Sequence, residues 1–161
     1  MKPGRIGKPV FIFMLIIVSG SALALYGWYL FMKPDLSHHL SQFPNMPFIL
    51  VPLAGIGFAL LNGVMEEFAF RGIIMHGFDC AFNDDTISIV LQALSFGLIH
   101  YDSGFPNGLM GTAMTFIYGI LLGLTRNMSK GMLAPIITHF FGDLVVFSIL
   151  ATIFFSAGAG R

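Results

Sequence analysis

Seven ionisable residues lie inside long apolar stretches of this sequence, where charged groups are costly. Such residues are expected only where they pair with one another, line a polar cavity or take part in chemistry. Carboxylates and imidazoles are also side chains that commonly move protons in catalysis. The seven residues are Glu66, Glu67, Arg71, His76, His100, His139 and Asp143. They form the first candidate for a functional site.

Spacing within the first group separates two roles. Glu67 and Arg71 are four residues apart with the acid first, the order that suits an ion pair on one helix face. Glu66 points about 100° away from Glu67 around a helix and has no such partner in its own stretch. We therefore predict that Arg71 neutralises Glu67 and that Glu66 is free to act as a base. The alternative is a buried charge cluster that only ties helices together.

The composition places these residues in a membrane. The chain has 161 residues, of which 56% are hydrophobic and 10% charged, whereas soluble domains carry about 25% charged residues. At ~20 residues per crossing, the length allows one domain of about four or five membrane helices. A net charge of zero gives no footprint for nucleic acid, and Cys80, the only cysteine, excludes a disulfide within the chain.

Five apolar stretches predict an all-α, polytopic bundle of about five membrane helices. The stretches cover residues 10–31, 48–78, 86–100, 108–125 and 132–157. A cleaved signal peptide is the competing interpretation of the first stretch, but the apolar run continues past its small residues. We predict a single domain over 1–161, with a retained N-terminal anchor helix in 1–33 and a catalytic core in 48–150.

The positive charges predict the orientation of this bundle. Five alternating crossings put Lys33 and Arg161 on one side, and a larger group of cations on the other. That larger group consists of Lys2, Arg5, Lys8, Arg126 and Lys130. Because cytoplasmic loops are enriched in Lys and Arg, the N-terminus is predicted to be cytoplasmic. A re-entrant segment would change this parity.

The same assignment brings the candidate residues to a similar depth. At ~1.5 Å per residue from the cytoplasmic helix ends, Glu66, His100, His139 and Asp143 lie roughly 12 to 21 Å deep. Helices assigned from apolarity and charge alone need not bring four polar residues together. Their convergence favours a mid-bilayer site over a purely structural charge cluster.

Three motifs resemble those of the CPBP intramembrane proteases, which include type II CAAX prenyl endopeptidases and the Abi or bacteriocin-immunity proteins. Residues 66–72, Glu-Glu-Phe-Ala-Phe-Arg-Gly, fit the family's EExxxR motif. Residues 96–100 fit FxxxH, and residues 139–143 fit HxxxN or HxxxD. The resemblance extends over residues 48–150, and the three motifs occur in the family's order.

The resemblance implies hydrolysis of a peptide bond by a water molecule that a glutamate activates. Glu66 would take the proton, helped by His100, and Phe96 would pack on the His100 imidazole one turn away. A carboxylate away from bulk water is well suited to this role, because low polarity favours its uptake of a proton. His139 and Asp143 would stabilise the oxyanion of the tetrahedral intermediate.

Asp143 departs from the commoner pattern, in which this position is Asn. An ionised aspartate cannot donate a hydrogen bond. Either Asp143 is protonated and donates, or it accepts a hydrogen bond from His139 and holds that ring in place. The second alternative is slightly favoured.

No cofactor is predicted, although a zinc site stays an alternative. Glu66, His100 and His139 are ligand types that suit catalytic zinc, but the H-E-x-x-H pattern is missing. His38 and His39, in a polar loop, and His76, near a helix end, are not expected to contribute. Cys80 lies in a link where no histidine partner is expected, so a cysteine protease is not predicted.

The expected partners are the lipid bilayer and a membrane-anchored protein or peptide substrate. The substrate is predicted to carry a C-terminal sorting helix or a CAAX-type tail, and the small size resembles the minimal, sorting-type members called myxosortases. Short loops suit a bacterial inner membrane. The alternative function is a non-catalytic membrane protein on the same scaffold, such as a bacteriocin-immunity protein or a chaperone. Nothing in the residues predicts an oligomeric state.

Overall fold

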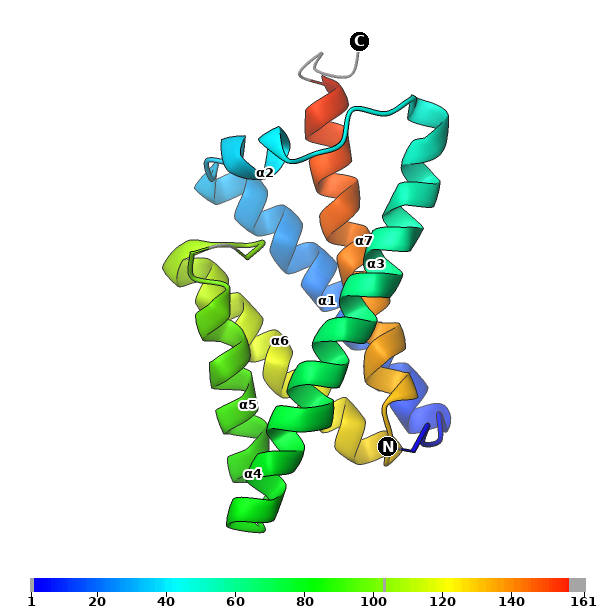
Figure 1. The fold of residues 1–161 in the computed structure, drawn as a ribbon, viewed down its shortest axis with the longest axis vertical. Coiled ribbons are helices and arrows are strands. Elements are labelled where there is room, and N and C mark those ends of the chain that lie inside the picture. Colours follow the sequence, from blue (N-terminus) through cyan, green and yellow to red (C-terminus); the bar gives the residue numbers. More distant parts are fainter. Residues whose placement is uncertain (1, 103, 157–161) are drawn as a thin grey trace.

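The computed structural model describes residues 2–102 and 104–156, which form helices, turns and loops but no strand. In chain order the helices are α1 (Lys8–Met32), α2 (Ser37–Ser41), η1 (Phe48–Leu50), α3 (Val51–Glu67), η2 (Phe68–Ile74), α4 (Met75–Phe82), α5 (Asp85–Ile99), α6 (Gly108–Ser129) and α7 (Leu133–Ser156) (Figure 1). The predicted all-α bundle is therefore confirmed.

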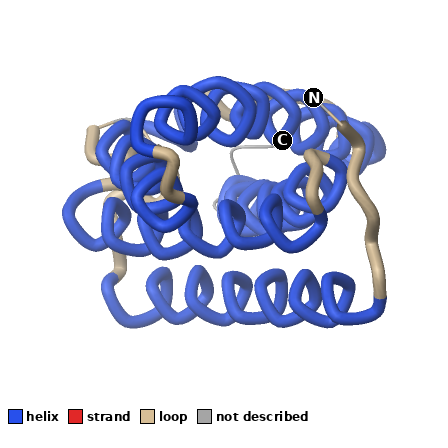
Figure 2. Tube along the Cα trace, turned by 90° about the horizontal axis from the view of Figure 1, so that it is seen from below, coloured by secondary structure: helices blue, strands red, loops and turns tan. Residues whose placement is uncertain are grey.

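Successive long helices run in alternating directions along the bundle (Figure 1). α5 packs on α6, and α3 packs on α7. α1 packs mainly on α7 and α6, and the view from below shows the N-terminal segment leading into this helix at one side of the bundle (Figure 2). α7 is thus the helix through which α1 mainly contacts the part of the bundle that carries the three motifs.

Four helical segments are long and apolar enough to cross a membrane: 8–32, 48–82, 108–129 and 133–156. α5 is apolar but has only 15 residues, which span ~22 Å, against a hydrocarbon core of ~30 Å. Four of the five predicted crossings thus correspond to helices long enough to span a membrane, and the stretch predicted as the third crossing forms the shorter helix α5. The link from α5 to α6 consequently lies below the upper end of the bundle (Figure 1).

The segment 48–82 is one continuous helical rod that contains a π-helix. η2 is the π-helical part, and it begins directly after Glu67. The sequence predicts a single long apolar helix here, but not the change from α-helix to π-helix after Glu67. π-helical turns occur frequently at functional sites, and this one contains Arg71.

Local sequence explains several helix ends. Pro9 lies in the first turn of α1, where a missing backbone N–H is tolerated, and Lys33 ends α1 with a left-handed φ of 45°. The Asp84 carboxylate caps α5 by accepting hydrogen bonds from the backbone N–H groups of Thr86 and Ile87. The Asp84 cap fixes where α5 begins, and therefore where His100 lies at its other end.

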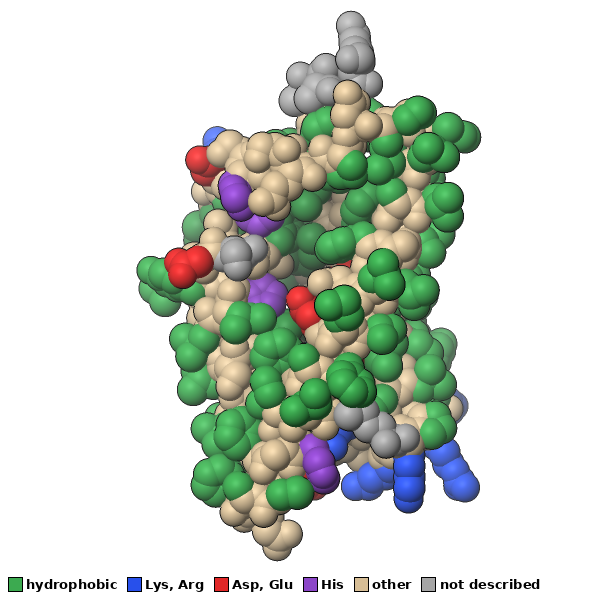
Figure 3. All heavy atoms as spheres, viewed as in Figure 1, with side chains coloured by type: hydrophobic (Ala, Val, Ile, Leu, Met, Phe, Trp, Pro, Cys, Tyr) green, Lys and Arg blue, Asp and Glu red, His purple; other side chains and the backbone are tan. Residues whose placement is uncertain are grey.

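The cations separate between the two ends of the bundle. Lys and Arg side chains gather at the lower end, where the N-terminal segment meets the α6–α7 turn (Figure 3). Lys33 ends α1 at its other end, and Arg161 lies outside the described residues. The predicted separation of charge is present, whereas the membrane face of each end stays a prediction.

Candidate active site

A cavity of about 650 Å³ lies inside the bundle, and its lining includes Glu66, His100, His139 and Asp143. α1, α3, α6 and α7 contribute most of its wall, together with the end of α5 and the link after it. The surface is hollowed on this face, with histidine and acidic side chains inside the hollow (Figure 3). The structure therefore brings together the four residues that the depth argument placed at one level.

Glu67 and Arg71 lie behind the cavity wall and are completely buried. An N–H group of Arg71 donates to Glu67 Oε1 at 2.8 Å, which confirms the predicted ion pair. Another guanidinium N–H donates to the backbone oxygen of Gly119 at 3.3 Å. The guanidinium also lies 4.6 Å from the centre of the Phe96 ring, where a cation is attracted by the ring face.

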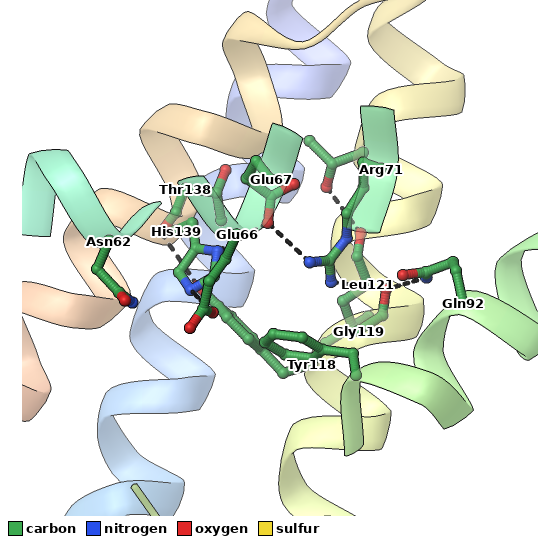
Figure 4. Close-up of polar contacts among 12 residues, drawn as sticks. Asn62, Glu66, Glu67, Arg71, Gln92, Tyr118, Gly119, Leu121, Thr138 and His139 are labelled. Carbon is green, nitrogen blue, oxygen red and sulfur yellow. Dashed lines mark hydrogen bonds and ion pairs between the residues drawn. The ribbon is translucent and has the colours of Figure 1, made fainter. Parts of the chain in front are cut away.

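Glu67 also holds His139. His139 Nδ1 lies 2.7 Å from Glu67 Oε1, the same oxygen that accepts from Arg71 (Figure 4). Asp143, the partner slightly favoured from the sequence, does not accept a hydrogen bond from this ring. Asp143 Oδ1 lies 3.6 Å from His139 Nε2, which is beyond hydrogen-bond range. α3 and α7 pack directly together, which brings Glu67 within hydrogen-bond distance of His139.

Glu66 takes no part in this buried pair. Its Oε2 lies 3.4 Å from His139 Nε2, and its side chain keeps 24% exposure on the cavity side. The two neighbouring glutamates therefore differ as the helix geometry predicted. Glu67 is bound to the buried side chains of Arg71 and His139, whereas Glu66 faces the cavity.

His100 is fixed from its own helix. Its Nδ1 lies 2.8 Å from the backbone oxygen of Phe96, to which it donates. The Phe96 and His100 rings pack with centres 4.6 Å apart, which confirms the predicted contact. With Nδ1 carrying the hydrogen, a neutral His100 keeps Nε2 as an acceptor.

Two polar side chains near the site were not identified from the sequence. Asn62 Nδ2 donates to Asp143 Oδ2 at 3.2 Å, and the spacing that could have revealed it is its place one turn before Glu66. Tyr118 donates to the backbone oxygen of Thr138 at 3.3 Å, and its ring centre lies 5.6 Å from that of His139. Both Asn62 and Tyr118 line the cavity.

Of the remaining histidines, His39 also lines the cavity, which was not expected from the sequence, whereas His76 does not. His39 Nε2 is 3.1 Å from the backbone oxygen of Gly104, so the linker containing α2 contacts the α5–α6 link above the cavity. His76 Nε2 lies 3.8 Å from Cys80 Sγ. The expectation that Cys80 has no histidine beside it was therefore wrong, because the two residues are one helical turn apart. Neither His76 nor Cys80 lines the cavity.

Within 2–102 and 104–156, no three His, Cys, Asp or Glu side chains are arranged to hold a metal ion. In His139, one ring nitrogen is bound to Glu67 and the other faces Glu66 and Asp143. In His100, one nitrogen is bound to a backbone oxygen. Among these acids and imidazoles, Glu67 and His139 are joined by a hydrogen bond, and His100 is held separately by its own helix.

Comparison with known proteins supports the resemblance seen in the motifs. No curated protein and no solved structure matches the chain. The family model described as type II CAAX prenyl endopeptidase Rce1-like matches residues 46–145, which include all three motifs. With this match and four helices fit to cross a membrane, the chain is an integral membrane protein that belongs to the Rce1-like family of type II CAAX prenyl endopeptidases.

Proposed function

We propose that this protein is an intramembrane endopeptidase in which Glu66 activates the attacking water. Its family is one of CAAX-type proteases. The observation that supports the glutamate mechanism is that two adjacent carboxylates lie in different environments. Glu67 is buried and bound to Arg71 and His139, while Glu66 faces a cavity that His100 also lines.

In the proposed reaction, a water molecule lies between Glu66 and His100 Nε2. Glu66 takes a proton from this water as its oxygen attacks the peptide carbonyl carbon. The carbonyl double bond opens to an oxyanion. When the oxyanion re-forms the double bond, the C–N bond breaks and the protonated Glu66 gives its proton to the departing amine nitrogen. His100 accepts the water's other hydrogen bond and orients the lone pair that attacks.

The oxyanion is assigned to the side of the cavity formed by His139. Because His139 Nδ1 is used by Glu67, His139 can donate to the oxyanion only when Nε2 also carries a hydrogen. We therefore propose an imidazolium at His139. The carboxylates of Glu66, Glu67 and Asp143 surround it at 3.4, 2.7 and 3.6 Å, and opposite charges at this range stabilise a cation.

The cavity lining supports a proposal for the substrate class. Apolar side chains make up most of the lining, which suits a membrane-embedded segment rather than a charged soluble peptide. We propose a membrane-anchored protein as the substrate, cleaved near a C-terminal sorting helix or a CAAX-type tail. The basic end of the bundle is proposed to face the cytoplasm of a bacterial inner membrane, following the distribution of Lys and Arg.

Removal of metal ions tests this function. Protein reconstituted in liposomes with a membrane-anchored peptide should cleave it at the same rate with and without EDTA, because the proposed step uses only side chains and water. Mass spectrometry of the products measures the rate, and a Glu66→Gln sample controls for contaminating metalloproteases. Loss of activity in EDTA with recovery in Zn²⁺ but not Mg²⁺ would support a zinc mechanism instead. Stoichiometric peptide binding without cleavage would support the immunity or chaperone function.

Substitution at Asp143 tests the oxyanion arrangement. Asp143→Asn should lower the cleavage rate at every pH, because the amide keeps the shape but no longer stabilises the His139 cation. Asp143→Ala should lose more, up to the ~10²–10³-fold that removal of an oxyanion group typically costs. The measurement is the rate against pH for both variants in one detergent. A rate that Asp143→Asn retains or improves, most clearly at high pH, would instead identify a protonated Asp143 as the donor.

A further inference from the structure

A second, basic pocket of about 250 Å³ lies at the lower end of the bundle, outside the proposed active site. It forms where the N-terminal segment meets the turn between α6 and α7. Its lining consists of Lys2, Arg126, Asn127, Lys130, Gly131 and Met132. None of the three motifs contributes to it.

Backbone hydrogen bonds hold the two halves of this pocket together. The Arg5 N–H donates to the Ser129 oxygen at 2.8 Å, and the N–H groups of Met132 and Leu133 donate to the Lys2 and Pro3 oxygens at 3.1 and 3.0 Å. Gly4 adopts a φ of +83°, and a side chain on Gly131 would collide with the Gly4 backbone. Lys2 and Lys130 therefore lie on two backbone segments that are hydrogen-bonded and closely packed against each other.

The pocket has more positive charge than its surroundings neutralise. Arg126 pairs with Asp79 at 3.2 Å. Lys2 and Lys130 form no ion pair within the part of the chain that the structure describes. At the start of α7, the backbone N–H groups of Met132 and Leu133 already donate to the N-terminal segment. The attraction for an anion must therefore come from the lysine side chains.

The position of the pocket indicates which class of anion could reach it. α1 begins, α6 ends and α7 begins beside it, and all three are candidate membrane spans. Span ends lie at the level of the lipid headgroups. Next to the pocket, Met128 and Leu133 expose apolar side chains by 46% and 45%, which gives acyl chains a surface to contact.

We propose that this pocket binds the phosphate of an anionic phospholipid, with Lys2 and Lys130 as its principal ligands. The site acts independently of the proposed peptidase function, since its lining shares no residue with the cavity that contains Glu66 and His139. Basic pockets at helix ends are a known way in which membrane proteins recognise anionic headgroups. Each lysine should strengthen lipid binding roughly fivefold, the equivalent of the typical attraction per cation near an anionic surface.

The test measures lipid binding to the full chain by native mass spectrometry in a neutral detergent. Phosphatidylglycerol should bind more tightly than phosphatidylcholine. The double variant Lys2→Ala/Lys130→Ala should weaken phosphatidylglycerol binding by roughly 25-fold. Lys33→Ala, which removes a lysine at the far end of α1, is the matched control and should leave it unchanged.

Several results would overturn the proposal. Equal binding of the two lipids would remove the role of negative charge, and the same loss per lysine in Lys33→Ala as in the double variant would show that net charge alone matters. Inorganic phosphate serves as the second probe. If it displaces phosphatidylglycerol at similar concentration, the pocket is a site for free phosphate and not for a lipid.

Discussion

Glu66→Gln is expected to abolish cleavage while leaving the fold intact. The amide keeps the size of the side chain but cannot take a proton from water, and loss of a general base typically costs ~10²–10⁴ in rate. Glu66 forms no ion pair with Arg71, and its 3.4 Å contact with His139 is made from a partly exposed side chain on the cavity side, so loss of its charge should cost far less stability than loss of the buried Glu67 charge. The measurement is the product formed from a membrane-anchored peptide by equal amounts of folded protein.

The control for Glu66→Gln is thermal unfolding in the same detergent, which should match wild type within a few degrees. Wild-type cleavage by a correctly folded Glu66→Gln protein would remove Glu66 from the mechanism. A protein that no longer unfolds cooperatively would instead give Glu66 a structural role. The two results separate catalysis from stability at this position.

Glu67→Gln should have the opposite signature, a large loss of stability. The amide oxygen of the new side chain can still accept hydrogen bonds, but the completely buried Arg71 guanidinium is left without a counter-charge. Breaking a buried ion pair from one side typically costs about 3–5 kcal/mol. The free energy of unfolding in detergent, or the shift in Tm where unfolding is irreversible, measures the effect.

A double variant separates charge compensation from other causes. Glu67→Gln/Arg71→Met removes both charges, and replacement of a buried pair by neutral groups of similar volume is often nearly neutral. The double variant should therefore be more stable than Glu67→Gln alone, although His139 loses its ionic partner in both and activity should stay low. If the double variant is as unstable as the sum of the single variants, the pair does not act as a unit.

Charge and helix spacing predicted much of this site. The Glu67–Arg71 pair followed from an i,i+4 spacing, and the shared depth of Glu66, His100 and His139 followed from counting residues along apolar stretches. These predictions succeeded because ionisable groups are so costly in lipid that few arrangements can hold them.

The contacts between distant helices were not predictable in the same way. Asn62 and Tyr118 are neutral, so nothing in their type separated them from other polar residues in apolar helices. Which ring nitrogen of His139 meets Glu67 depends on how closely α3 packs on α7. The π-helix of η2 also has no residue spacing of its own in the sequence by which it could be recognised.

The shortness of α5 has a consequence for the supply of water to a site inside a bilayer. With ~22 Å of helix against ~30 Å of hydrocarbon, this side of the bundle has a hydrophobic mismatch of ~8 Å. A short membrane segment is accommodated in part by local thinning of the bilayer. His100 stands at the upper end of α5 and lines the cavity, so thinning there brings the hydrated headgroup layer toward the reactants. In the proposed mechanism, the short helix thus shortens the route by which water reaches Glu66.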